Sequence, residues 1–78
     1  MHQYPAYRKY KGIDVWFKII SDRHFVELKK IGEKWIKHEV KAEQYPEIIL
    51  IQDMLACAEG RWEVMNNEDF EAALVKAE

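Results

Sequence analysis

A glycine at position 32 divides two strand-like segments and limits how the middle of the chain can fold. Phe25–Ile31 and Lys34–Lys41 lie on either side of the pair Gly32-Glu33. A two-residue turn with glycine in its first position is typical of a tight β-hairpin. A helix over residues 22–31, capped by Ser21 and ended by Gly32, fits the same letters. The sequence leaves both alternatives open, and we prefer the hairpin.

The hairpin interpretation also predicts which residues face each other across the two strands. A three-residue loop would place Glu27 opposite Glu39, which brings like charges together. The two-residue turn instead places opposite charges, or a cation and an aromatic ring, across from each other. We therefore expect the register in which Ile31 opposes Lys34, Lys30 opposes Trp35, Glu27 opposes His38 and Phe25 opposes Val40.

The segment Asp14–Ile20 predicts a strand that precedes the hairpin. Its side chains Val15, Phe17 and Ile19 fall on one face, and the opposite face is nearly as apolar. A strand that is apolar on both faces belongs inside a sheet.

A helix is predicted in the region that follows the hairpin. Pro46 suits the first helical position, and Gly60 suits a stop after Glu59. Apolar residues recur on one side of this segment at helical spacing. The β-branched residues within 47–51 fit a buried strand as well, so this alternative stays open.

The last part of the chain predicts a short strand and a second helix. Arg61–Met65 has the composition of the strand. Asn66 is a good helix cap, and Met65 stands where it can pack against Phe70 one turn into the helix.

Together these segments predict an α+β domain in the order strand, strand, strand, helix, strand, helix. We expect a small, mostly antiparallel sheet with the two helices packed on one face. A single domain spans residues 1–78, within which residues 1–11 could form a flexible or loosely packed arm.

The composition limits the classes of protein to which the chain can belong. Of its 78 residues, 49% are hydrophobic and 33% are charged, which excludes disorder over the whole length. The formal net charge of −2 argues against a dedicated nucleic-acid binder. The single cysteine, Cys57, excludes an internal disulfide and zinc sets with two or more thiolates. We expect no metal and no cofactor.

The sequence also predicts where the protein is located. Its longest apolar run, Ile48–Ile51, is far shorter than the roughly 18 residues that cross a bilayer. The first ten residues are polar and aromatic, where a signal peptide needs an apolar stretch of about 7–15 residues. We therefore expect a cytoplasmic protein with no membrane partner.

Charge is distributed unevenly along the chain. Residues 1–41 hold ten basic and five acidic residues, whereas residues 42–78 hold two basic and nine acidic residues. Such a difference indicates an anionic partner for the basic half, or attraction between the two halves within a domain or between subunits. A domain this small buries only about 60% of its unfolded surface, so self-association is one way to gain buried area.

Aromatic residues supply the candidates for a protein interface. Three tryptophans and seven other aromatic residues are more than so small a core can readily bury. Exposed tryptophan and tyrosine side chains are common anchors of protein interfaces. Trp16 and Trp35, together with Tyr10, are therefore the predicted interface residues, and the predicted assembly is a homodimer.

The basic N-terminal half supplies an alternative. Three tyrosines interleave with three cations in Tyr4–Lys11, a mixture that can stack on bases and contact phosphates. Lysines along a hairpin equally protect an exposed edge from aggregation. The candidate anion-binding residues are Arg8, Lys9, Lys11, Lys30 and Lys34.

One polar pair has the residue types of a general base. In the predicted register Glu27 faces His38, and a carboxylate can orient an imidazole ring. An ordinary surface pair has the same arrangement, and no nucleophile is implied nearby. We assign no catalytic residue and expect a non-enzymatic interaction module that self-associates. The alternative is a small nucleic-acid-binding accessory protein.

Overall fold

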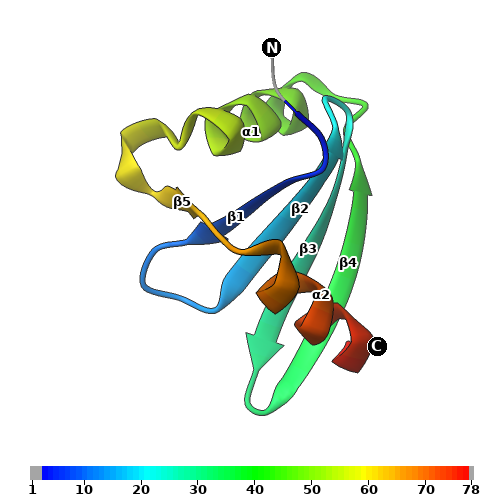
Figure 1. Cartoon of the computed structure of the whole chain (residues 1–78). Helices are drawn as coiled ribbons and strands as arrows, with labels where there is room; N and C mark the ends of the chain where they lie inside the picture. Colours follow the sequence, from blue (N-terminus) through cyan, green and yellow to red (C-terminus); the bar gives the residue numbers. More distant parts are fainter. Residues whose placement is uncertain (1–2, 78) are drawn as a thin grey trace.

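Five antiparallel strands form one sheet, and two α-helices pack against it (Figure 1). The computed structural model describes residues 3–77. The elements are β1 Ala6–Tyr10, β2 Val15–Ser21, β3 His24–Ile31, β4 Lys34–Lys41, α1 Tyr45–Ala56, a 3₁₀ turn Ala58–Gly60, β5 Trp62–Val64 and α2 Asn67–Lys76. The strands lie in the order β4-β3-β2-β1-β5. The α+β class, the antiparallel sheet and the order of the predicted elements are confirmed.

The hairpin of β3 and β4 forms as predicted. Gly32 has φ +64°, in the left-handed region that glycine adopts at low cost, and this conformation permits the two-residue turn. The four predicted pairs, from Ile31 with Lys34 to Phe25 with Val40, are all present. The helix alternative for residues 22–31 is therefore wrong.

The N-terminal segment contains a strand that the sequence did not predict. A loose arm over residues 1–11 is wrong for Ala6–Tyr10, because this segment is β1 and pairs with both β2 and β5. β1 can lie inside the sheet without an alternating apolar pattern, because its polar side chains have partners within the fold. Lys9 Nζ lies 3.2 Å from Glu63 Oε1, and Arg8 donates hydrogen bonds to α1.

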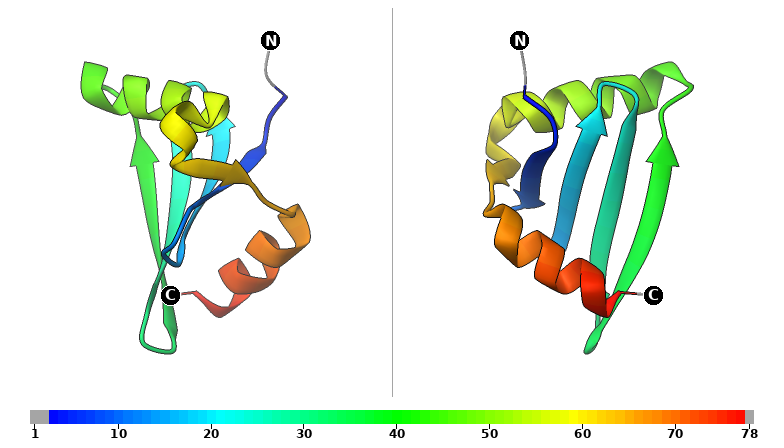
Figure 2. Two further views of the ribbon diagram at one scale, coloured as in Figure 1. Left: turned by 90° about the vertical axis from the view of Figure 1, so that its left-hand side faces the viewer. Right: turned by 45° about the vertical axis from the view of Figure 1, so that its right-hand side comes forward.

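The expectation that both helices pack on one face of the sheet is also wrong, since they lie on opposite faces (Figure 2). Phe17 and Phe25 belong to the apolar cluster beneath α1, whereas Val26 and Leu28 belong to the cluster beneath α2. Successive residues of a strand point to opposite faces. Because β2 and β3 are apolar on both sides, each face of the sheet requires its own helix.

Helix α1 forms where it was predicted but ends early. Residues 47–51 are helical, so the strand alternative for them is wrong. The helix ends at Ala56 rather than at Glu59, and Cys57 follows with φ +52°. Arg8 donates to the backbone carbonyls of Met54 and Leu55 in the last helical turn, and Met54 O also accepts from the backbone N–H of Cys57.

Helix α2 is capped as predicted. The Oδ1 atom of Asn66 accepts a hydrogen bond from the backbone N–H of Glu68 at 2.6 Å. Met65 packs against the cluster that contains the fully buried Phe70. Within residues 3–77, neither this helix nor α1 is long and apolar enough to span a membrane.

Candidate interaction surface

Two of the three predicted interface residues lie together. Trp16 on β2 and Trp35 on β4 have ring centroids 4.5 Å apart, with their planes inclined by 40°. Both are half-buried and pack beside the cluster beneath α2, and Lys30 Nζ lies 5.9 Å from the centroid of the Trp35 ring. Tyr10 lies apart from them, edge-on to Trp62 in the cluster beneath α1.

The predicted anion-binding residues do not share one role. Arg8 donates through Nε to Met54 O at 3.0 Å and through Nη2 to Leu55 O at 3.1 Å. Lys9 forms an ion pair with Glu63. Lys30 lies over Trp35, while Lys11 and Lys34 have exposed side chains in turns or at a strand end. Two of these five cations, Arg8 and Lys9, therefore already have partners within the fold.

The predicted pair Glu27 and His38 is aligned but not joined. The register places the two residues opposite each other, yet no hydrogen bond or ion pair connects them in the described part of the chain. The imidazole and carboxylate that do meet are His24 Nε2 and Glu39 Oε2, at 2.9 Å. They lie diagonally across β3 and β4, a contact that the same register implies and the sequence interpretation missed. The described residues hold no cluster of three metal-ligand side chains.

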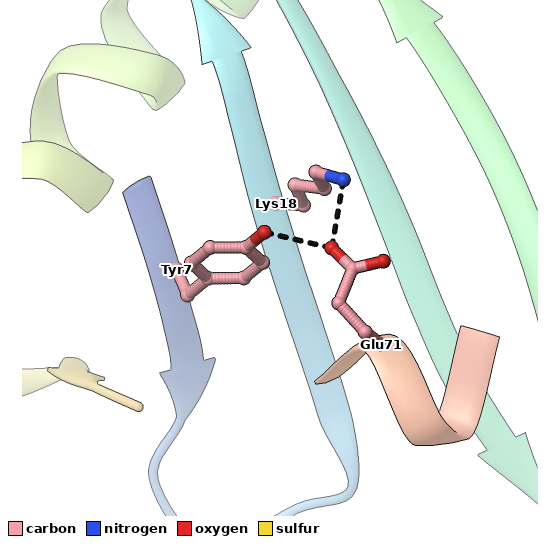
Figure 3. A network of polar contacts seen from close by, with 3 residues as sticks. All are labelled: Tyr7, Lys18 and Glu71. Carbon is pink, nitrogen blue, oxygen red and sulfur yellow. Dashed lines mark hydrogen bonds and ion pairs between the residues drawn. The ribbon is translucent and has the colours of Figure 1, made fainter. Parts of the chain in front are cut away.

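A second polar cluster joins α2 to the sheet (Figure 3). The hydroxyl of Tyr7 donates to Glu71 Oε2 at 2.7 Å, and Lys18 Nζ donates to the same oxygen at 2.7 Å. The three residues come from β1, β2 and α2. Sequence reasoning missed this cluster because it did not identify β1 as a strand.

The pKa directions in this cluster indicate a structural contact. Burial and the hydrogen bond to Glu71 raise the pKa of Tyr7, and the same carboxylate raises the pKa of Lys18. The hydrogen bonds from Lys18 and Tyr7 lower the pKa of Glu71. Each group therefore holds its ordinary charge state more firmly near neutral pH, whereas proton transfer requires a pKa close to the working pH. The cluster fastens α2 to β1 and β2.

Replacing Glu71 with glutamine is expected to lower the free energy of unfolding by about 1 kcal/mol, because the partly exposed ion pair with Lys18 is lost. The stabilisation by Glu71 is complete above its ordinary pKa of 4.5 and is lost as the pH falls through the lowered value of the folded state. The contributions of Tyr7 and Lys18 are complete below pKa values of 10.0 and 10.5 and are lost as the pH rises through their raised folded values.

Urea unfolding across the pH range measures these effects. The Glu71→Gln variant should lose stability less steeply than the wild type in acid. Glu33→Gln, a change in the exposed hairpin turn, is the control and should follow the wild type. If the free energy of unfolding of the wild type and of Glu71→Gln fell equally steeply in acid, the stabilising role of the Glu71 carboxylate would be contradicted.

The largest unpartnered feature of the sheet is its β4 edge, the free side of strand Lys34–Lys41. β4 is eight residues long and pairs only with β3 among the described strands, whereas the opposite edge strand, β5, has three residues. The hairpin projects beyond the ends of β1 and β2 (Figure 1). Most β4 side chains are exposed, so this edge is open to another chain.

Two exposed isoleucines lie beside the β4 edge. Ile31 and Ile36 are 55% and 45% exposed, and the register places both on the sheet face that α1 covers. α1 lies across the far end of this face, away from the hairpin turn (Figure 2). We name Ile31 and Ile36 the isoleucine patch. Exposed aliphatic side chains next to an open strand edge are a typical protein contact surface.

Comparison of the chain with protein-family models, with curated proteins and with solved structures gave no match. The function must therefore be inferred from the geometry of the β4 edge and the groups around it.

Proposed function

We propose that this protein is a small, cytoplasmic, non-enzymatic interaction module that self-associates as a symmetric dimer through the β3–β4 hairpin. The observation that carries the proposal is the β4 edge, with the isoleucine patch beside it. An unpaired strand offers a row of backbone donors and acceptors that another strand can complete. A twofold arrangement uses the same surface on both subunits.

The tryptophans have different parts in this proposal. Trp35 lies on β4 itself and would contribute directly to the contact. Trp16 stacks against Trp35 and supports its position. Tyr10 packs against Trp62 near β5 and lies outside the proposed contact.

Nucleic-acid binding has weaker support than self-association. Arg8 and Lys9, the two cations at the centre of the basic N-terminal segment, are engaged with α1 and Glu63. A phosphate would have to compete with these internal partners. The three other candidates, Lys11, Lys30 and Lys34, are exposed, and three lysines make a small electrostatic footprint.

Sedimentation velocity over a hundredfold range of concentration tests the proposal. The wild-type protein should pass from monomer to dimer, at low and at high salt. Ile36→Lys should raise the dissociation constant by about tenfold or more, because it removes an apolar contact and adds a cation. Val64→Lys is the matched control, since Val64 is 68% exposed on the other edge strand and should leave association unchanged.

Two results would contradict the proposed function. One is a wild-type protein that remains a monomer at every concentration. The other is an equal loss of association in Ile36→Lys and Val64→Lys, which would show that the effect is not specific to the β4 edge.

A further inference from the structure

The hairpin register determines which backbone groups of β4 are free. Residues that flank a two-residue turn, here Ile31 and Lys34, form a hydrogen-bonded pair, and such pairs alternate along an antiparallel ladder. Ile36, His38 and Val40 therefore direct their backbone groups toward β3. The residues that direct theirs toward the open edge are Trp35, Lys37, Glu39 and Lys41.

We propose that β4 pairs with β4 of a second copy of this chain, antiparallel, about a twofold axis that passes at His38. The two sheets then join into one continuous sheet (β4 is the outermost strand in Figure 2). This inference rests on the self-association proposed above and names the contact that produces it.

Charge and the length of paired strand together select this register among the symmetric ones. With the axis at Val40, Glu39 would meet Lys41, but only the C-terminal end of β4 would pair. With the axis at Lys37, the two Lys37 side chains would oppose each other, and with the axis at Glu39 the two carboxylates would. With the axis at His38, Lys37 faces Glu39 of the second copy, and the pair occurs twice by symmetry. This register also keeps almost the whole length of β4 in the contact.

Two further pairs of this register are complementary as well. Ile36 faces Val40 of the second copy on the side of the sheet that carries α1, and Val40 is already packed at the rim of the cluster there. Trp35 faces Lys41 of the second copy on the other side, where a cation can lie against the indole ring. The two aliphatic side chains Ile36 and Val40 meet each other, and the lysines Lys37 and Lys41 meet a carboxylate and an aromatic ring.

In this arrangement the lysines of β4 determine which register β4 adopts with a second strand. Lysine on an open edge ordinarily prevents pairing with other strands. Here Lys37 opposes every register that brings it to another lysine, while Glu39 favours registers in which it meets a lysine, and among these the His38 register pairs the most of β4. Glu39 keeps Oε1 for this contact, because its hydrogen-bond contact with His24 uses Oε2.

Charge reversal in mixed samples tests the register. Lys37→Glu alone places two carboxylates opposite each other twice, and Glu39→Lys alone does the same with two ammonium groups. Each variant should have a dissociation constant raised by about tenfold or more. An equimolar mixture of the two forms a heterodimer in which both pairs are again of opposite charge, so its association should return to within about threefold of the wild type.

Recovery of association in the mixture of Lys37→Glu and Glu39→Lys shows that neither variant failed to associate because it was misfolded. Glu39→Lys also removes the contact with His24, so circular dichroism and thermal unfolding of each variant alone establish that it is folded. A mixture of Lys37→Glu with the wild-type chain is the matched comparison. It should associate more weakly than the wild type, whereas a register with Lys37 facing Lys37 would make it stronger.

Disulfide trapping gives an independent measurement in a Cys57→Ser background. His38→Cys should form a disulfide-linked dimer rapidly on mild oxidation, because the axis brings the two positions directly opposite each other. Ile36→Cys is the control and should cross-link slowly, since the axis separates its two copies along the strands.

The outcomes separate this inference from the proposed function. A wild-type protein that is monomeric at all concentrations contradicts both the self-association and the His38 register. A wild-type dimer whose mixed variants fail to recover association, or in which Ile36→Cys cross-links faster than His38→Cys, retains self-association and overturns the His38 register.

Discussion

Replacing Phe70 with alanine is expected to lower the free energy of unfolding by about 3–5 kcal/mol. Phe70 is fully buried and holds α2 against Val26 and Leu28, and its ring centroid lies 5.5 Å from that of Tyr7. A domain of this length has a total of about 4–12 kcal/mol. The substitution should therefore remove a large share of the stability and free α2 from the sheet.

Urea unfolding followed by circular dichroism measures this loss. Val75→Ala is the matched control, because Val75 lies on the same helix and is 86% exposed. Its effect should stay within about 0.5 kcal/mol. Equal unfolding midpoints for the two variants would show that α2 contributes little to the fold.

The second large effect is expected at Arg8. Arg8→Met should lower the free energy of unfolding by about 2–3 kcal/mol, because it removes charge-assisted hydrogen bonds to Met54 O and Leu55 O. It also removes a positive charge from the C-terminal end of α1, where the helix dipole favours a cation. Leu55 O then loses its side-chain donor, whereas Met54 O keeps the hydrogen bond from the backbone N–H of Cys57.

Arg61→Met is the control for this substitution. Arg61 is the same residue type near the end of α1, but it lies on the surface over Trp62 and pairs with Glu59. We expect a loss of at most about 1 kcal/mol from it. Chemical denaturation of both variants measures the difference. Equal losses would mean that the hydrogen bonds of Arg8 add no stability beyond the effect of its charge.

The parts of the fold that could be predicted are those with a local cause. Gly32 specifies the turn, and the turn specifies the register of Lys30 with Trp35 and the other pairs. Asn66 specifies the start of α2 through a hydrogen bond two residues along the chain. In each case the responsible residues lie within a few positions of one another.

The parts that could not be predicted depend on distant partners. Tyr7 binds Glu71 across 64 positions of sequence, and Arg8 binds Met54 across 46. Without those partners β1 has the composition of a polar tail. The opposite placement of the helices follows from the apolar character of both faces of β2 and β3. The sequence shows this property at Trp16 and Phe17, but the prediction that both helices share one face did not take it into account.

The candidate site was predicted in part. The sequence indicated Trp35 and the hairpin strands, and the structure adds that β4 has one open side. The polar contacts that form, His24 with Glu39 and the cluster at Glu71, lay outside the prediction. Side-chain reach across a sheet decides these contacts, and pattern alone does not encode it.

The position of β1 affects how the chain folds during its synthesis. β1 is an inner strand whose second neighbour, β5, and whose polar partner on α2 are synthesised more than fifty residues after it. The nascent chain can close the β3–β4 hairpin as it emerges, but β1 must wait with one side unpaired. Contacts of such long sequence separation make folding slower, so β1 is expected to gain its full set of partners late in folding.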